Sequence, residues 1–215
     1  MPAAIKILLV DDEPALLEMG KIFLEQQSGE IIVETAASAR NALLSLSCGS
    51  YDAVVSDYEM PEMDGIGFLK HLRSAENNIP FILFTGRGRE EVAIEALNHG
   101  ATFYLQKGYD ARAQYTELAH KIRQAVRQFR AERSVRESER RVEHLLNFLP
   151  DPTIAMDMEG RLIMWNRATE EMTGVMASEV MGKGDYEYTI PFFGNKRPLI
   201  ADFLRTPDNA GLARY

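Results

Sequence analysis

The side chains best suited to chemistry in this sequence are three carboxylates, a hydroxyl and an ammonium, each found after a short apolar run: Asp11, Asp12, Asp57, Thr85 and Lys107. Carboxylates that lie together repel one another unless a cation neutralises them. Mg²⁺ suits such a group because it takes oxygen ligands and commonly bridges carboxylates to a phosphate. A lysine and a hydroxyl add groups that bind phosphate oxygens. The set therefore predicts a site where a phosphoryl group is handled with Mg²⁺.

Each of these residues also has an ordinary structural interpretation. An aspartate at the end of a strand is often a turn former or the cap of the next helix, so Asp57 alone would not identify a site. Thr85 could simply end a strand, Lys107 could be a solvated loop lysine, and the early acids could cap a helix. The residues form a site only if the fold brings the ends of their strands together.

Apolar runs and amphipathic segments alternate from residue 5 to about residue 128, which predicts strands followed by helices. The predicted strands cover residues 5–10, 31–35, 53–55, 81–84 and 102–105. Helices are predicted to begin near Pro14, Ser38, Asp64, Glu90 and Asp110, with Ser38, Asp64 and Asp110 as N-caps. This alternation predicts an α/β fold with a five-stranded parallel sheet, doubly wound by helices on both faces. Such sheets bind ligands at the carboxyl ends of their strands, where we expect the five side chains to meet.

Residues 3–128 resemble a response-regulator receiver domain, the phosphoacceptor of two-component signalling. The matching motifs are Asp11-Asp12 after the first strand, Asp57, Met60-Pro61 and Asp64-Gly65 after the third, Thr85-Gly86 after the fourth, and Lys107 after the fifth. The resemblance implies a flavodoxin-like receiver in which Asp57 accepts a phosphoryl group from the phosphohistidine of a sensor histidine kinase.

The same resemblance implies a role for each matching residue. Mg²⁺ would be held by Asp11, Asp12, Asp57 and the backbone carbonyl of Glu59. Lys107 would pair with the phosphoryl oxygens, Thr85 would move to hydrogen-bond them, and Tyr104 would be the switch aromatic that fills the space behind Thr85. Tyr104 is equally well interpreted as an ordinary half-buried tyrosine.

The loop after Lys107 departs from the receiver pattern. Receivers usually follow this lysine with a proline in a cis peptide, whereas this chain has Gly108. Glycine tolerates unusual backbone angles but does not favour the cis bond as proline does. We therefore expect the role of the lysine to persist on a loop of different geometry.

A long helix is predicted after the receiver. Apolar residues recur at spacings of three and four from Leu118 to Phe129, mixed charges follow from Arg130 to Arg141, and the apolar stripe resumes from Val142 until Pro150. We assign residues 129–149 to a helical linker. We expect a homodimer through this helix and the receiver face, with a monomeric spacer helix as the alternative.

The sequence after Pro150 predicts a second, smaller module over residues 150–215. Two short apolar segments flank an acidic turn with Gly160, which predicts a hairpin, and residues 167–173 predict a helix that ends at Gly174. The runs Trp165-Asn166-Arg167-Ala168 and Met172-Thr173-Gly174 resemble the opening of a PAS sensor domain, which implies a partial α+β PAS-like segment. No Cys or His follows residue 144, so we do not expect a flavin–cysteine photoreceptor or a histidine-ligated haem.

Composition limits the class of protein. With 215 residues and a formal charge of −8, the chain is long enough for one large domain or two small ones, and its acidic balance argues against nucleic acid as the main partner. It has no apolar run long enough for a membrane span and no signal peptide at its start, so we expect a cytoplasmic protein without a membrane partner.

These observations predict a response regulator of a two-component phosphorelay, phosphorylated on Asp57 by a histidine kinase with Mg²⁺ and switching an interaction surface. Such a protein is not an enzyme in the usual sense, since it catalyses only its own phosphotransfer and dephosphorylation. The alternatives are the N-terminal fragment of a hybrid sensor histidine kinase, a Mg²⁺-dependent phosphohydrolase, and an adaptor whose receiver is inactive.

Overall fold

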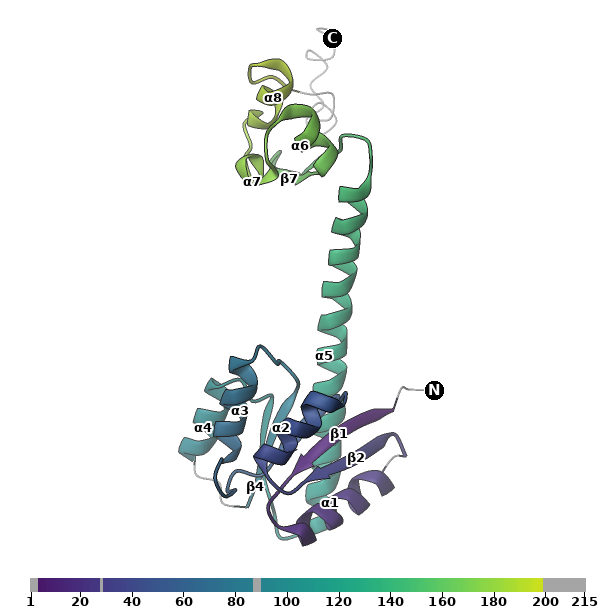
Figure 1. The fold of residues 1–215 in the computed structure, drawn as a ribbon, viewed down its shortest axis with the longest axis vertical. Coiled ribbons are helices and arrows are strands. Elements are labelled where there is room, and N and C mark those ends of the chain that lie inside the picture. The colour runs from purple at the N-terminus through teal and green to yellow at the C-terminus, as the bar shows by residue number, and fades with distance from the viewer. Residues whose placement is uncertain (1–3, 28, 87–89, 199–215) are drawn as a thin grey trace. The chain divides into compact units, whose positions relative to one another are not determined.

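The computed structural model describes residues 4–27, 29–86 and 90–198, and the chain divides into two compact units, Met1–Ser134 and Val135–Tyr215. The elements of the first unit are β1 (Ile5–Val10), α1 (Pro14–Gln26), β2 (Ile31–Ala36), α2 (Ala39–Cys48), β3 (Ala53–Ser56), α3 (Gly65–Ser74), β4 (Phe81–Thr85), α4 (Glu90–Asn98) and β5 (Phe103–Gln106). Helix α5 (Ala111–Phe148) begins in the first unit and ends in the second (Figure 1). The predicted alternation of five strands and five helices is confirmed.

The five strands of the first unit form one parallel sheet in the order β2-β1-β3-β4-β5. This is the flavodoxin-like order, in which the strand sequence reverses between β1 and β3. The register pairs Val10 at the end of β1 with Ser56 at the end of β3. The loops after these two strands therefore leave the sheet side by side.

Helices flank both faces of the sheet (Figure 1), and the central strands β1, β3 and β4 are buried on both sides. Successive residues of β1 alternate between two cores: Ile7 and Leu9 pack with α1 and α5, whereas Leu8 and Val10 pack with α2, α3 and α4. Full burial of an aliphatic side chain of this size stabilises a fold by about 1.5–3 kcal/mol. The continuous apolar runs in the sequence are explained by this burial on two sides.

Three helices begin at the caps that the sequence predicts. The Ser38 hydroxyl accepts a hydrogen bond from the N–H of Asn41 at 3.2 Å, and the Asp64 carboxylate accepts from the N–H of Gly67 at 2.6 Å. The Asp110 carboxylate accepts from the N–H groups two and three residues further on, at 2.9 and 3.2 Å. Each cap satisfies a backbone donor that has no partner inside the helix, and typically contributes about 1 kcal/mol.

Helix α5 is anchored to the start of the first strand. The Arg130 guanidinium donates to Asp52 Oδ1 at 2.8 Å and to the carbonyl oxygen of Ala4 at 3.0 Å. The other oxygen of Asp52 accepts from the N–H of Lys6 at 2.9 Å. These bonds hold α5 to the first unit as far along as Arg130, five turns beyond its first residue by the pitch of an α-helix.

The second unit contains the predicted hairpin and helix. Strands β6 (Ile154–Met156) and β7 (Leu162–Trp165) pair antiparallel, and α6 (Arg167–Thr173) ends at Gly174 in the left-handed conformation. The short elements α7 (Ala177–Val180), η1 (Glu187–Thr189) and α8 (Ile190–Phe193) follow and were not predicted. A small core contains Leu162, Trp165, Val180 and Tyr188. Residues 199–215 of the predicted segment lie outside the described residues.

A single buried amide connects the elements of the second unit. Asn166 is 1% exposed, and its Nδ2 donates to the carbonyl oxygens of Leu146 at 3.2 Å and Asp151 at 3.0 Å. Its Oδ1 accepts from the N–H of Thr153 at 2.8 Å and from the hydroxyl of Thr169 at 2.6 Å. The side chain thus joins the last turn of α5, the start of β6 and the first turn of α6.

Within the described ranges, no helix is both long and apolar enough to cross a membrane.

Candidate functional site

The carboxyl ends of the strands in the first unit surround a pocket. Its lining residues are Asp11, Asp12, Glu13, Leu16, Asp57, Glu59, Thr85, Gly86 and Lys107. Every residue that the sequence predicts for the site, apart from Tyr104, is in this set. The fold therefore brings the predicted carboxylates, hydroxyl and ammonium to one place, as the strand order requires.

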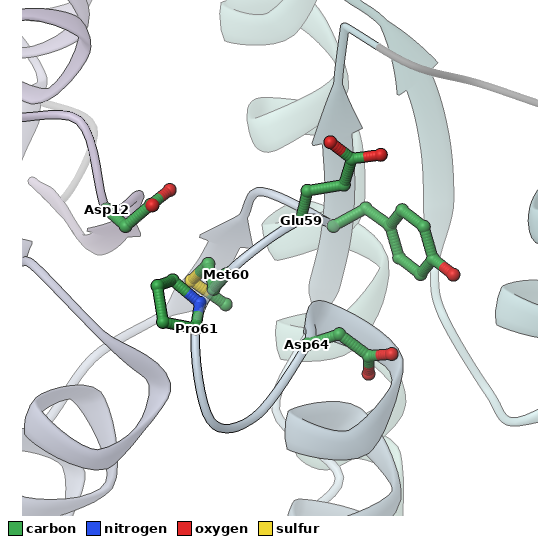
Figure 2. Close-up of a pocket in the computed structure, with 6 residues that line it drawn as sticks. Asp12, Glu59, Met60, Pro61 and Asp64 are labelled. Atoms are coloured by element: carbon green, nitrogen blue, oxygen red, sulfur yellow. The ribbon is translucent and has the colours of Figure 1, made fainter.

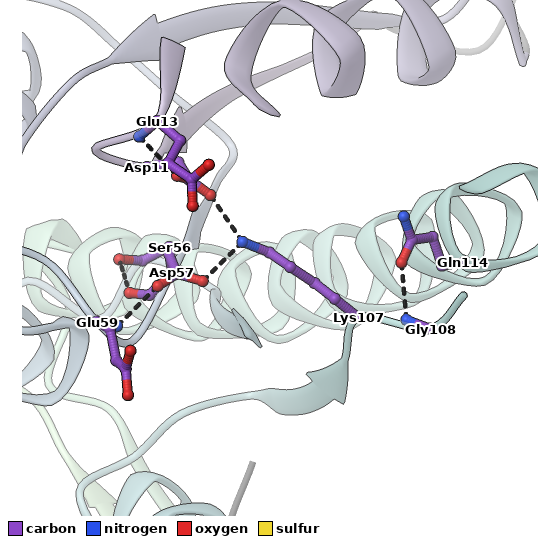
Figure 3. A network of polar contacts seen from close by, with 8 residues as sticks. All are labelled: Asp11, Glu13, Ser56, Asp57, Glu59, Lys107, Gly108 and Gln114. Atoms are coloured by element: carbon purple, nitrogen blue, oxygen red, sulfur yellow. Dashed lines mark hydrogen bonds and ion pairs between the residues drawn. The ribbon is translucent and has the colours of Figure 1, made fainter. Parts of the chain in front are cut away.

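The ammonium of Lys107 lies between two buried carboxylates. Its Nζ is 2.7 Å from Asp57 Oδ1 and 2.7 Å from Asp11 Oδ2, as Figure 3 shows. Asp57 is 8% exposed and Asp11 is 5% exposed, so both carboxylates are largely removed from water. Charge-assisted hydrogen bonds of this length are stronger than those between neutral groups. Here a single ammonium bonds to two carboxylates.

Backbone bonds fix the position of Asp57. Its N–H donates to the carbonyl of Val10 at 2.8 Å, which continues the pairing of β3 with β1 past the end of the strand. Its Oδ2 accepts from the N–H of Glu59 at 2.7 Å, and the Ser56 hydroxyl donates to its carbonyl at 2.8 Å. The carboxylate is therefore held with one oxygen toward its own loop and the other toward Lys107 (Figure 3).

The pKa values of the site reflect this arrangement. Burial raises the pKa of Asp57 above its ordinary value, and the nearby Asp11 adds to the increase, although Lys107 opposes both. For Lys107, burial alone would lower the pKa, but the bonds to Asp11 and Asp57 outweigh it and leave the pKa raised. The lysine is therefore charged at neutral pH, and one ammonium does not fully offset the burial of the Asp57 carboxylate.

Gly65, at the start of α3, allows the loop after β3 to lie close to the sheet. A Cβ at this position would overlap the carbonyl oxygen of Asp57 and would lie 2.7 Å from the side chain of Leu83. The N–H of Gly65 donates to the carbonyl of Tyr58 at 2.9 Å. A residue without a side chain is thus required here because the backbone that carries Asp57 occupies the space.

Asp12 and Glu59 are exposed and face a second, adjoining pocket. Its other lining residues are Tyr58, Met60, Pro61 and Asp64. Figure 2 shows Asp12 on the loop after β1, separated from Glu59 and Met60 on the loop after β3. Asp12 and Glu59 line both pockets, so these two residues stand at the solvent side of the buried pair of carboxylates.

The donor set is suited to a hard cation, although the side chains do not enclose one by themselves. Among the residues that the structure describes, no three acidic, histidine or cysteine side chains converge as a metal site. Asp11 and Asp57 converge instead on the Lys107 ammonium, a cation placed between two carboxylates. Mg²⁺ takes oxygen ligands and keeps several waters. The pocket suits this ion because it offers the carboxylate oxygens of Asp11, Asp12 and Asp57 and is open to solvent on one side.

Thr85 and Tyr104 lie on neighbouring strands but in different surroundings. Thr85 ends β4, is 1% exposed and lines the site pocket, and its carbonyl accepts from the N–H of Lys107 at 2.8 Å. Tyr104 lies on β5, is half-buried and packs against the core that contains α3 and α4, and it is not among the residues that line the pocket. Burial raises the pKa of Tyr104. Its predicted switch role stays a prediction.

Sequence reasoning missed two contributions to the site. It assigned Lys107 to phosphoryl oxygens and did not anticipate the bond to Asp11, which depends on the distance between β1 and β5 across the sheet. It also gave no role to Gln114, whose Oε1 accepts from the N–H of Gly108 at 2.8 Å (Figure 3). No sequence signal pointed to this bond, because the capping-box position three residues after Asp110 is Ala113.

Comparisons with known proteins agree with this geometry. The family model for the response regulator receiver domain matches residues 7–122, and the model for the PAS fold matches residues 140–191. The chain is 40% identical over 110 residues to the regulatory protein AtoC of Escherichia coli, covering 51% of this chain and 23% of that protein. It is 32% identical over 120 residues to the transcriptional regulatory protein FixJ of Bradyrhizobium diazoefficiens, covering 55% of this chain and 57% of that protein.

Solved structures show the same likeness. The receiver domain of the Francisella response regulator 1452 superposes with a TM-score of 0.52 at 29% identity, covering 58% of this chain and 98% of that one. A receiver domain from Clostridium thermocellum gives a TM-score of 0.53 at 31% identity, covering 59% of this chain and 98% of that one. The matched receiver model covers more than half of the sequence, and a PAS fold follows it. This chain therefore belongs to the response regulator receiver family.

Proposed function

We propose that this chain is a response regulator whose receiver accepts a phosphoryl group on Asp57 from a sensor histidine kinase, with Mg²⁺ as cofactor. The observation that carries the proposal is the buried pair of carboxylates, Asp11 and Asp57, with the Lys107 ammonium 2.7 Å from each, in a pocket that Thr85 also lines. A structural ion pair needs only one carboxylate for each lysine. A surplus of buried negative charge at an open pocket instead indicates a place where further positive charge and a phosphoryl group are bound.

The proposed step is an in-line displacement at phosphorus. An oxygen of the Asp57 carboxylate forms a bond to phosphorus, while the bond from phosphorus to the donor imidazole nitrogen breaks and its electron pair stays on nitrogen. Lys107 neutralises charge on the transferring group, and Asp57 is held in place by the N–H of Glu59. Positioning and electrostatics account for the rate, because a carboxylate is a weak nucleophile.

Asp11, Asp12, Asp57 and the backbone carbonyl of Glu59 are the groups proposed to hold Mg²⁺. When bound, the ion supplies positive charge that favours the ionised form of Asp57 and offsets charge on the phosphoryl oxygens. The raised pKa of Asp57 supports this need, since the lysine alone leaves the buried carboxylate insufficiently compensated.

Phosphorylation then changes the receiver by adding about 1.5 to 2 negative charges and three acceptor oxygens. Lys107 and the Thr85 hydroxyl are placed to bind them, because both line the pocket beside Asp57. We propose that the movement of Thr85 is transmitted to Tyr104 on the adjacent strand and alters the surface formed by α4, β5 and α5. Thr85 pairs with Gln106 in the register of β4 and β5, so the two strands that would carry the change are hydrogen-bonded neighbours.

A second copy of this chain is the partner we propose for the exposed apolar residues of α4 and α5. These residues are Ile94 and Leu97 on α4, and Val135, Val142, Leu145 and Phe148 on α5. On α5, Val135 and Val142 are seven residues apart and Leu145 follows three residues later, the spacing typical of paired helices. Sedimentation equilibrium should show self-association that Leu145→Glu weakens and Arg140→Glu, on the opposite side of the helix, leaves unchanged. A monomer at all concentrations, with and without phosphodonor, would contradict this partner.

The phosphoacceptor is tested by incubating the whole chain with Mg²⁺ and a small-molecule phosphodonor, followed by intact mass measurement. We expect one labile phosphoryl group on the wild type, none with EDTA, and none on Asp57→Asn. Asp110→Asn is a matched control, because asparagine caps a helix as well as aspartate and Asp110 lies outside the pocket.

The other outcomes identify the alternatives. Turnover of small phosphate esters, which a receiver does not hydrolyse, would indicate a phosphohydrolase, and an unlabelled wild type would indicate an adaptor with an inactive receiver. Labelling of Asp57→Asn equal to that of the wild type would place the acceptor elsewhere and refute the proposal.

A further inference from the structure

The loop that carries Lys107 is restrained from both sides by single hydrogen bonds. On the strand side, the N–H of Lys107 donates to the carbonyl of Thr85 at 2.8 Å. On the helix side, the N–H of Gly108 donates to Gln114 Oε1 at 2.8 Å, as Figure 3 shows. The side chain of Lys107 therefore leaves a backbone that is held immediately before and immediately after it.

Gly108 would otherwise be the loosest point of this loop. Apart from Gly108 and its chain neighbours, no atom lies within 4 Å of the position that a Cβ would occupy here, so a side chain at this position would have nothing to pack against. Glycine also has the widest choice of backbone angles. A change of backbone angles at this residue would redirect the chain directly beside Lys107, so some other contact must fix it.

Gln114 is well placed to provide that restraint. Its own N–H donates to the carbonyl of Asp110 at 3.1 Å, and the Asp110 carboxylate caps the first turn of α5. The main chain of Gln114 is thus part of a capped helix, while its side chain reaches back six residues to Gly108. The capped start of α5 is therefore bonded to Gly108, the residue next to the site lysine.

We propose that Gln114 is a positioning residue for the phosphotransfer, acting through Gly108 to hold the Lys107 ammonium between Asp11 and Asp57. This inference rests on the proposed function, because it assigns Gln114 an effect on the rate of that reaction. Gln114 does not line the site pocket, so it acts only through the loop. Loss of one hydrogen bond of this kind would slow phosphorylation of Asp57 by about 2- to 10-fold.

The test compares two near-isosteric substitutions in the whole chain. Gln114→Met keeps the length and helix propensity of the side chain but has no oxygen to accept from Gly108, whereas Gln114→Glu keeps the acceptor. With Mg²⁺ and a small-molecule phosphodonor, Gln114→Met should slow labelling by about 2- to 10-fold. Gln114→Glu should stay within about twofold of the wild type.

Two controls separate positioning from a general loss of structure. Gln128→Met alters another glutamine of α5, whose Nε2 donates to Glu132 at 2.9 Å away from the site, and it should label at the wild-type rate. The Tm of Gln114→Met should fall below that of Gln114→Glu by no more than the few degrees expected for one lost hydrogen bond, while amide exchange in the peptide containing Gly108 should be faster for Gln114→Met alone. If that variant proves unstable, Gln114→Ala gives the same test with the best helix-forming residue.

The results distinguish this inference from the function on which it rests. Equal labelling rates for Gln114→Met and the wild type, or equal slowing by Gln114→Glu, would overturn the positioning role and leave Asp57 as the acceptor. Absence of label on the wild type would instead overturn the proposed function.

Discussion

Replacing Lys107 by methionine should destabilise the first unit strongly when no divalent metal is present. Methionine retains most of the apolar stem, so the substitution mainly removes the ammonium. Two carboxylates that are 5% and 8% exposed, Asp11 and Asp57, would then lie together without a cation. Removing one partner of a buried ion pair typically costs about 3–5 kcal/mol. Because the Lys107 side chain is itself 18% exposed, we expect the lower end, about 3 kcal/mol.

The destabilisation caused by Lys107→Met should become smaller as the pH falls. The pKa of Asp57 is already raised in the folded protein, and Lys107 is the group that most opposes this increase. Without the lysine the folded-state pKa rises further above the unfolded value. A carboxyl of this kind reduces stability at pH values above its folded pKa, and the effect disappears as pH falls toward the unfolded value of about 4. Lys107→Met should therefore be most destabilised near pH 8 and close to the wild type near pH 4.

Urea unfolding with EDTA, followed by far-UV circular dichroism between pH 4 and pH 8, measures this difference. The fluorescence of Trp165, the single tryptophan of the chain, identifies the transition of the second unit and separates it from that of the first. Lys70→Met is the matched control, since its exposed pair with Glu95 is worth at most about 1 kcal/mol. Equal stability of Lys107→Met and the wild type at pH 8 would refute the assignment of Lys107 as the cation that balances the two carboxylates.

Three further outcomes follow from the geometry. Gly65→Ala should destabilise the first unit by about 1–3 kcal/mol, measured by urea unfolding, because the added methyl overlaps the backbone of Asp57. Asn166→Asp should lower the midpoint of the Trp165 fluorescence transition by an amount equivalent to about 2–4 kcal/mol, since a carboxylate cannot donate to the carbonyls that the amide now binds. Arg130→Ala should increase amide exchange in residues 127–134 of α5 while exchange in α3 is unchanged, because only the anchored turn loses its contact with Asp52.

Much of the receiver fold could be predicted because its signals are local. The central strands β1, β3 and β4 are apolar runs buried on both faces, and the caps Ser38, Asp64 and Asp110 stand where helices must satisfy free N–H groups. The site could be predicted because parallel strands place their carboxyl ends along one edge, so that the ends of β1 and β3 determine where Asp11 and Asp57 lie.

The remaining features depend on distances that no local pattern contains. Asp11 and Lys107 are 96 residues apart, and their bond exists because the loops after β1 and β5 converge above the sheet. The six polar contacts of Asn166 depend on three elements meeting at one point, whereas the sequence showed only an asparagine before a helix. The short helices near Tyr188 lack the length over which periodicity becomes visible.

The anchor between Arg130 and the start of the chain has a consequence for how the receiver is made. Ile5 pairs with Ile31 only 26 positions later, so β1 finds its first partner strand soon after synthesis begins. The hydrogen bond from Arg130 to the carbonyl of Ala4 joins residues 126 positions apart. A ribosome that adds about 5–20 residues per second needs roughly 6–25 s to produce this length of chain. Both partners of β1 in the sheet, β2 and β3, are therefore made well before Arg130. Arg130 is synthesised after all five strands of the sheet, so its bond to Ala4 can form only once the whole sheet has been made.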